Sequence, residues 1–203
     1  MIDTRRLRCV IGWLGIALPV FVLILSLLYG DTFPNSISST YYREPCIAPF
    51  MIILGWASGI LICYKGYELV DDIICSFAGI FGFGVCLFPC FSYRDVDGIV
   101  GTFQLPNETS DIIHTISAII FFILLSYNSL FLFTKSDSNI TDNKKKRNII
   151  FRVCGVGMIA SFALLLFPIP HKVWVVETIA LAFFGISWLT KANCYPWLFS
   201  DNK

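Results

Sequence analysis

The sequence predicts an all-α protein, a polytopic membrane bundle of six transmembrane helices in a single integral membrane domain, residues 1–203. Two observations carry this prediction. The chain is 56% hydrophobic and only 14% charged, whereas a soluble domain carries roughly 25% charged residues. The charged residues also cluster between apolar runs of about 20 residues, the length that crosses roughly 30 Å of hydrocarbon.

Six apolar runs are long enough to cross a bilayer. The predicted spans cover residues 9–29, 46–64, 73–92, 111–134, 148–167 and 173–189. The first follows three arginines, as a signal peptide would, but its apolar run is too long for one and lacks an A-x-A-like cleavage site. We therefore expect a retained helix. In the third span, Gly79, Gly82 and Gly84 predict close helix packing, and Pro89 is expected to kink or end the helix.

The connections alternate between tight turns and longer loops, so we expect antiparallel neighbours. Residues 93–110 contain glycines, Pro106 and acidic side chains, which indicates a loop with a short strand. Residues 135–147 are predicted to form a solvated basic loop. In the tail, Tyr195 and Trp197 are placed like interfacial anchors.

The distribution of basic residues predicts the orientation, because an excess of Lys and Arg marks the cytoplasmic face. With six spans, both termini share one side. That side holds Arg5, Arg6, Arg8, Lys65, Lys135, Lys144, Lys145, Lys146, Arg147, Arg152, Lys191 and Lys203, and the other side holds Arg43, Arg94 and Lys172. Both termini are therefore predicted to be cytoplasmic.

This orientation gathers polar residues at the outer end, around the first loop NSISSTYYREPC. The candidate pocket residues are Ser38, Ser39, Tyr41, Tyr42, Arg43, Glu44, Asp111, His114 and Glu177. Glu177 lies about one turn inside an apolar run, where an ionisable group is costly and normally has a partner in the bundle interior. Candidate partners are His114, Arg43 and the two tyrosines. Such a group can fix helix packing, line a pocket for a lipid head group or small ligand, or take part in catalysis or metal binding.

Other chemistries have little support in the sequence. A metal site would have to use His114, Glu177 and Asp111, but the chain has only two histidines and no HxxxH or HExxH spacing. No cofactor is predicted. A hydrolase built from Ser38 or Ser39 with His114 and Glu177 is conceivable, but the G-x-S-x-G elbow is missing.

Net charge and the positions of the cysteines further limit the kinds of function that the sequence supports. The net charge of +1 gives no basis for nucleic-acid binding. The eight cysteines form no CxxC and no zinc spacing. In an oxidising compartment Cys46 and Cys90 could form a bridge. The alternative is that both are reduced and buried in apolar surroundings.

Several stretches resemble an uncharacterised bacterial family of six-span membrane proteins. They are NSISSTYY, CYKGYELVDD, IIHTISAIIFFILLSYNSLFLFTKS, KKKRNIIFRVCG and ETIALAFFGISWLTKA. This resemblance runs along nearly the whole chain and implies membership but no activity. More distantly, the chain is similar to the autophagy-modulator and GPI-anchor-remodelling membrane proteins, through REPC before the second span, His114 and Glu177. That similarity aligns Glu44 and Pro45 as well, and implies the topology and a lipid-facing role.

The sequence therefore predicts a protein of a bacterial inner (plasma) membrane that interacts with membrane lipids or a small ligand through an outward-facing polar pocket. One alternative is a membrane hydrolase or transferase that acts on lipid at the outer leaflet. A second is a small transporter, which would need polar residues through the whole membrane. The sequence does not indicate an oligomeric state.

Overall fold

The structure is a computed structural model that describes residues 4–29, 32–94, 96–135 and 141–194. Within these ranges it is all-helical, apart from one pair of two-residue strands. Six helices are long and apolar enough to cross a membrane. The predicted helical class and the presence of six membrane-length helices are thus confirmed. The predicted anchors Tyr195 and Trp197 lie outside the described residues.

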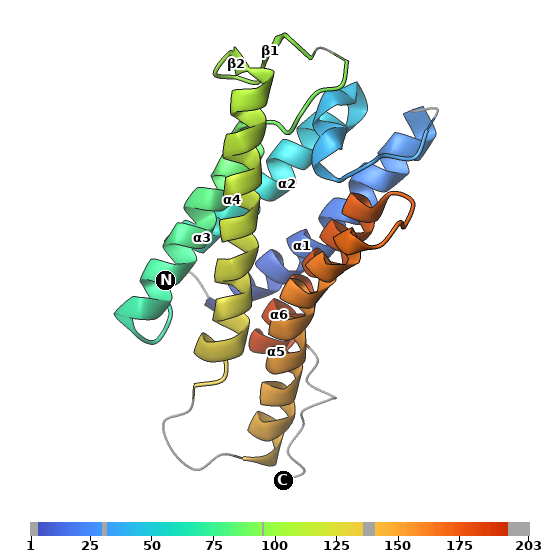
Figure 1. The fold of residues 1–203 in the computed structure, drawn as a ribbon. Helices are drawn as coiled ribbons and strands as arrows, with labels where there is room; N and C mark the ends of the chain where they lie inside the picture. Colours follow the sequence, from blue (N-terminus) through green and yellow to red (C-terminus); the bar gives the residue numbers. More distant parts are fainter. Residues whose placement is uncertain (1–3, 30–31, 95, 136–140, 195–203) are drawn as a thin grey trace.

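The bundle consists of six main helices and three short helical segments (Figure 1). The main helices are α1 (Thr4–Tyr29), α2 (Glu44–Cys63), α3 (Leu69–Leu87), α4 (Asn107–Tyr127), α5 (Asp142–Ala160) and α6 (Lys172–Lys191). The short segments are a 3-10 helix at Ser38–Tyr42 (η1), a π-helical turn at Asn128–Leu132 (η2) that continues α4, and a 3-10 helix at Ser161–Leu166 (η3) that continues α5.

The helices follow one another around a ring in sequence order. Each packs against the next one, and α1 packs against α6, which closes the ring. In Figure 1 the blue α1 accordingly lies beside the orange-red α6. The interior is rich in large aromatic side chains, and Trp188, Phe50, Phe151 and Phe184 are among the largest that are fully buried.

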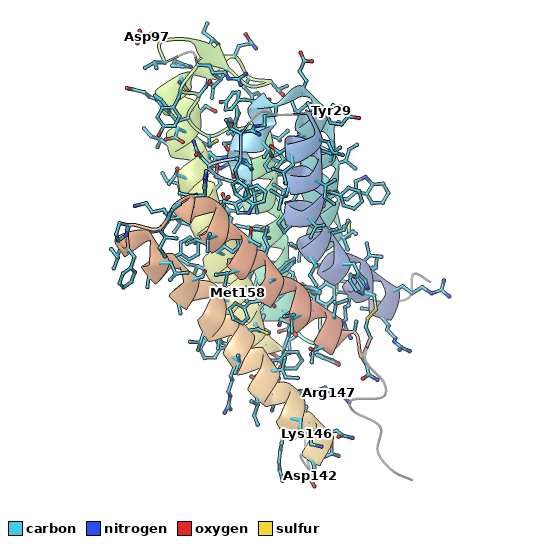
Figure 2. All side chains as sticks on the ribbon, turned by 90° about the vertical axis from the view of Figure 1, so that its right-hand side faces the viewer. Tyr29, Asp97, Asp142, Lys146, Arg147 and Met158 are labelled. Carbon is cyan, nitrogen blue, oxygen red and sulfur yellow. A yellow bond between two sulfur atoms is a disulfide. The ribbon has the colours of Figure 1, made fainter. Side chains whose placement is uncertain are left out.

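The two ends of the ring differ in what they carry. We call the end that holds the connections 32–43, 88–106 and 167–171 the loop end. The opposite end, where α1 begins and α6 ends, is the terminal end. Figure 2 shows Tyr29 and Asp97 at the loop end and Asp142, Lys146 and Arg147 at the terminal end.

Close approach of helices at glycines is confirmed. A Cβ added to Gly79 would lie 2.5 Å from the carbonyl oxygen of Ser58 on α2, and one added to Gly84 would lie 2.9 Å from the Cβ of Ser117 on α4. The small residues of α3 therefore let it pack tightly against both of its neighbours, as expected for helices that associate in lipid.

The α3 helix begins and ends earlier than its predicted span. It starts at Leu69, where Glu68 and Asp71 form a capping box. It ends at Leu87, two residues before Pro89, instead of reaching Ser92. A proline cannot donate the backbone hydrogen bond that would continue a helix, so the residues up to Ser92 belong to the loop end.

The prediction of a basic loop over residues 135–147 is wrong for its second half. The α5 helix already begins at Asp142, capped by the Thr141 hydroxyl, which accepts a hydrogen bond from the Lys144 amide at 3.3 Å. The Lys145 ammonium lies 2.9 Å from the Asp142 carboxylate one turn away. Lysine and arginine are good helix formers, so a strongly charged stretch can still extend a membrane helix beyond the bilayer.

The connection between α3 and α4 contains a small hairpin. Strand β1 (Ile99–Val100) pairs antiparallel with β2 (Leu105–Pro106). The α4 helix then begins at Asn107, four residues before the predicted span at Asp111. The Asn107 side-chain amide donates to the Ser92 carbonyl oxygen, and the Asn107 side-chain oxygen accepts the Ser92 backbone N–H, at 2.9 Å each. These two hydrogen bonds fasten the loop to the start of α4.

An ionic and aromatic network closes the terminal end. The Lys135 ammonium lies 2.6 Å from Glu68 and 3.0 Å from Asp71, and these hydrogen bonds raise the pKa of Lys135. The Arg8 guanidinium donates to the Tyr64 hydroxyl at 3.0 Å. Burial raises the pKa of Tyr64 to about 12, so its hydroxyl stays neutral.

Candidate functional site

The loop end separates the predicted pocket residues into three groups. Ser38 lines a small cavity with Glu177, and Ser39 and Tyr41 belong to the same short helix, η1. A second group, Asp111 and His114, fastens α4 to the end of α3. The third group, Tyr42, Arg43 and Glu44, lines an open cleft beside the end of α1.

Glu177 is bound by the first loop. One of its carboxylate oxygens accepts the Ile37 backbone N–H at 2.5 Å, and the other accepts the Ser38 hydroxyl at 3.1 Å. The donors therefore come from the residues that begin η1. The carboxylate attaches the first loop to α6 across 139 or 140 positions of sequence.

The rest of the first loop is fixed by local bonds and by contacts with α6. Ser36 and Ser39 exchange hydrogen bonds: the Ser39 amide donates to the Ser36 hydroxyl at 2.8 Å, and the Ser36 amide donates to the Ser39 hydroxyl at 3.1 Å. The Trp174 amide donates to the Asn35 carbonyl at 3.1 Å. Tyr41 packs against the apolar core. Ser39 and Tyr41 thus maintain the shape of the loop.

A cavity of about 40 Å³ lies below the loop, next to Glu177. Its lining residues are Leu18, Ile37, Ser38, Phe50, Leu54, Val85, Ala118, Phe121, Phe122, Glu177 and Leu181. This space suffices for water but not for a lipid head group. The lining includes neither His114 nor Asp111, so the cavity does not join these residues to Glu177.

His114 and Asp111 bind the backbone that follows α3. The His114 Nδ1 lies 2.7 Å from the Phe88 carbonyl oxygen, a distance at which the ring N–H donates to the carbonyl. The Asp111 carboxylate accepts the Phe91 amide at 2.8 Å. These bonds satisfy backbone groups that are left without helical partners beyond the end of α3.

The cleft beside α1 is the large polar opening of the loop end. It has a volume of about 570 Å³ and is lined by Ser26, Tyr29, Thr32, Tyr42, Arg43, Glu44, Pro45 and Arg94. Three of these are predicted pocket residues. Sequence reasoning did not select Ser26, Tyr29 and Thr32, although the spacing of Ser26 and Tyr29 places them on one face of α1.

Arg43 is held in place within the cleft. Its Nη1 donates to the Ser26 hydroxyl and, at 2.7 Å, to the Thr32 carbonyl oxygen, and its Nη2 donates to the Thr32 hydroxyl at 3.3 Å. These bonds connect the start of α2 to the last turn of α1 and to Thr32, just beyond it. Arg94, from the loop after α3, is exposed and reaches the same cleft.

Tyr42 forms the inner wall of the cleft. Its hydroxyl donates to the Cys90 carbonyl oxygen at 2.5 Å. Burial, followed by the nearby Cys90, Tyr41 and Asp111, raises the pKa of Tyr42 above its ordinary value. The phenol is therefore neutral at physiological pH and acts as a donor.

The cysteines pair differently from the bridge considered in the sequence. Cys46 and Cys90 are both free thiols. The Cys46 thiol donates weakly to the Val22 carbonyl oxygen at 3.6 Å, and burial raises the pKa of Cys90 to about 12. The hypothesis of a Cys46–Cys90 bridge is thus wrong.

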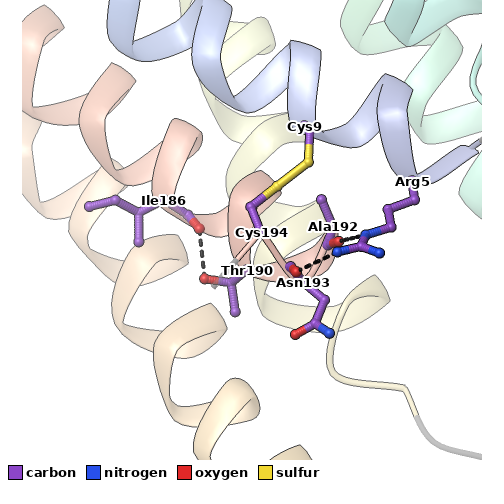
Figure 3. The surroundings of a disulfide bond; sticks show 7 residues. All are labelled: Arg5, Cys9, Ile186, Thr190, Ala192, Asn193 and Cys194. Carbon is purple, nitrogen blue, oxygen red and sulfur yellow. Dashed lines mark hydrogen bonds between the residues drawn. A yellow bond between two sulfur atoms is a disulfide. The ribbon is translucent and has the colours of Figure 1, made fainter. Parts of the chain in front are cut away.

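The disulfide of the described residues instead joins Cys9 on α1 to Cys194, just after α6, at the terminal end (Figure 3). Two hydrogen bonds from the Arg5 guanidinium accompany it, to the carbonyl oxygens of Ala192 at 3.0 Å and Asn193 at 3.1 Å. Because the two cysteines are 185 positions apart, sequence spacing gave no indication of the pair.

The arrangement gives little support to metal or acyl-transfer chemistry at the predicted residues. No group of three or more His, Cys, Asp or Glu side chains among the described residues could hold a metal ion. Ser38 bonds Glu177 directly, whereas His114 bonds the Phe88 backbone. A Ser/His/acid triad requires the histidine between the other two, and these hydrogen bonds leave it outside.

Comparison of the chain with protein-family models, with curated proteins and with solved structures found no match. The family resemblances seen in the sequence therefore stay predictions.

Proposed function

We propose that the protein is an integral membrane protein that binds a lipid or another small ligand in the polar cleft of its loop end. The observation that carries this proposal is the cleft of about 570 Å³, which contains two arginines. Small-molecule sites have volumes of roughly 300–1,000 Å³ and a few well-placed polar groups. Guanidinium groups bind phosphate and carboxylate oxygens through paired hydrogen bonds.

The distribution of charge supports an outward-facing cleft. Of the 14 basic residues that the structure describes, 11 belong to the terminal side and three to the loop side, and basic excess marks the cytoplasmic face. In the proposed orientation both termini are cytoplasmic and the cleft opens at the outer surface. The membrane would be a bacterial plasma membrane, as the family resemblance implies.

The hydrogen bonds of the bundle favour a binding role over transport. In the half of the bundle near the terminal end, the Ser126 hydroxyl donates to the Gly155 carbonyl and the Ser129 hydroxyl donates to the Phe151 carbonyl, at 2.7 Å each. The Asn128 amide donates to the Cys75 sulfur at 3.1 Å. These buried polar groups join helices to one another. A transport path would need polar groups that are available to a solute.

A binding measurement on the purified full chain in detergent tests this proposal. Short-chain phosphatidylethanolamine and phosphatidylglycerol serve as probes, and native mass spectrometry counts the bound lipid. We expect saturable binding that Arg94→Ala weakens by about tenfold, the effect of losing one charge-assisted hydrogen bond. Arg94 suits this test because no hydrogen bond or ion pair involves its side chain among the described residues.

Lys172→Ala is the matched control, since Lys172 is a basic residue of the loop end that lies outside the cleft and bonds the Leu165 carbonyl. Absence of saturable binding, or an equal loss in both variants, would refute the proposal. Cleavage products of the lipid in the same spectra would instead favour the hydrolase alternative.

A further inference from the structure

The cleft contains charges of both signs. Arg43 and Arg94 each bring a guanidinium group, and Glu44 brings a carboxylate. No ion pair joins these three side chains to one another or to any other described residue. The charges are therefore available to a ligand.

Arg43 is oriented before any ligand arrives. Its three hydrogen bonds to Ser26 and Thr32 use both Nη1 hydrogens and one Nη2 hydrogen. A guanidinium has five N–H donors, so the Nε hydrogen and one Nη2 hydrogen are still free. A pre-organised fork of this kind loses little entropy on binding a phosphate. Arg94 is exposed and can supply a second guanidinium.

Glu44 affects which anions the cleft can accept. It is the first residue of α2, where its charge also interacts favourably with the helix dipole. Its exposed carboxylate nevertheless lines the same cleft as the arginines. A carboxylate repels a purely anionic ligand and attracts a ligand that also carries an ammonium group. The three charges together complement a zwitterion.

An exposed aromatic side chain lines the cleft. Tyr29 lines the cleft at the last turn of α1 and is 72% exposed. Tyrosine at such a position is typical of the interface between lipid and water. An amphiphile with its head group in the cleft would therefore place its acyl chains beside Tyr29.

We propose that the cleft selects a zwitterionic head group of the phosphoethanolamine type, with its phosphate on Arg43 and Arg94, its ammonium on Glu44 and its acyl chains beside Tyr29. This inference rests on the proposed function, since it names the ligand class of the same cleft. The polar part of such a ligand could come from a membrane lipid or from a free phosphoamine.

The test compares three probes on the full chain in detergent. They are dihexanoyl phosphatidylethanolamine, dihexanoyl phosphatidylglycerol and glycerophosphoethanolamine, which has the head group without acyl chains. We expect the first to bind most tightly. Glu44→Gln should reduce the preference for phosphatidylethanolamine over phosphatidylglycerol by about two- to fivefold, as for a solvent-accessible ion pair. Arg94→Ala should weaken both lipids.

Glu108→Gln is the matched control, because Glu108 is an exposed glutamate in the first turn of α4 that does not line the cleft. An unchanged preference in Glu44→Gln, or tighter binding of phosphatidylglycerol to the original chain, would overturn the inference while leaving the proposed function in place. Equal binding of glycerophosphoethanolamine would overturn the role of the acyl chains and point to a free phosphoamine. Failure of all three probes would refute the proposed function itself.

Discussion

Glu177 shows what an ionisable residue in an apolar run can do. The sequence indicated that this carboxylate needs a partner, and the candidates it offered were all side chains. The structure supplies the hydroxyl of Ser38, which the sequence had grouped with Glu177, and the backbone amide of Ile37, which it had not. A backbone N–H is present in every residue except proline, so the residue type does not reveal which one will act as a donor. For this reason the sequence could pair Glu177 with the serine-rich loop, but could not find the bond from the Ile37 backbone.

Glu177→Ala is predicted to loosen the first loop. Removing the carboxylate leaves the donors of Ile37 and Ser38 without an acceptor, which costs about 1–3 kcal/mol. Glu177→Gln retains one acceptor oxygen and should cost less. Thermal unfolding in detergent, combined with proteolysis of the loop, measures both effects. Thr178→Val is the control, because the neighbouring Thr178 hydroxyl makes no hydrogen bond among the described residues. Equal melting temperatures for Glu177→Ala and Thr178→Val would contradict this role.

His114 is predicted to act on stability alone. His114→Ala leaves the Phe88 carbonyl oxygen without the hydrogen bond measured at 2.7 Å, and we expect a loss of about 1–2 kcal/mol. Lipid binding at the cleft should be unchanged, since His114 does not line it. Measuring the melting temperature and the lipid affinity on one sample separates the two roles. A variant with normal stability and impaired binding would show that His114 belongs to the binding site.

At the scale of helices, the sequence predicted where the apolar runs lie more accurately than where the helices end. Apolar length locates a span because the bilayer requires it. Helix ends depend on local groups such as the Thr141 cap and the Glu68–Asp71 capping box. These groups lie in polar stretches that hydropathy alone classes as loop, so the start of α5 was predicted six residues too late and the α3 boundaries were displaced.

Two glycines offer a matched test of the packing between α2 and α3. A Cβ at Gly79 would meet the Ser58 backbone at 2.5 Å, whereas a Cβ at Gly59 has its nearest neighbour at 3.9 Å. Gly79→Ala should therefore destabilise the bundle by about 1–3 kcal/mol through overpacking. Gly59→Ala should be neutral or stabilising by up to about 1 kcal/mol, because alanine favours a helix.

Unfolding of these two variants can be followed with a thiol-reactive dye, since Cys75, Cys86 and Cys154 are buried free thiols. If both alanines lowered the melting temperature equally, the close approach at Gly79 would not be what holds α2 against α3.

At the scale of the whole molecule, the distribution of basic residues and the disulfide favour opposite orientations in the membrane. The terminal end has the basic excess that marks the cytoplasmic face. The same end carries the disulfide between Cys9 and Cys194, and the cytosol keeps most thiols reduced. The proposed orientation is consistent with this disulfide only if the two cysteines are thiols inside the cell and become oxidised outside it.

This conflict gives a prediction about intact cells. Thiols trapped by rapid acid quenching and alkylation should include both Cys9 and Cys194. A membrane-impermeant maleimide should reach them only after the membrane is permeabilised. Cys63 is the internal control, because it is an exposed free cysteine at the terminal end of α2. Oxidation of the purified protein should then raise its stability, typically by about 2–4 kcal/mol for a disulfide. A pair already oxidised in quenched cells, together with a Cys63 labelled from outside, would place the termini outside and turn the Arg43–Arg94 cleft toward the cytoplasm.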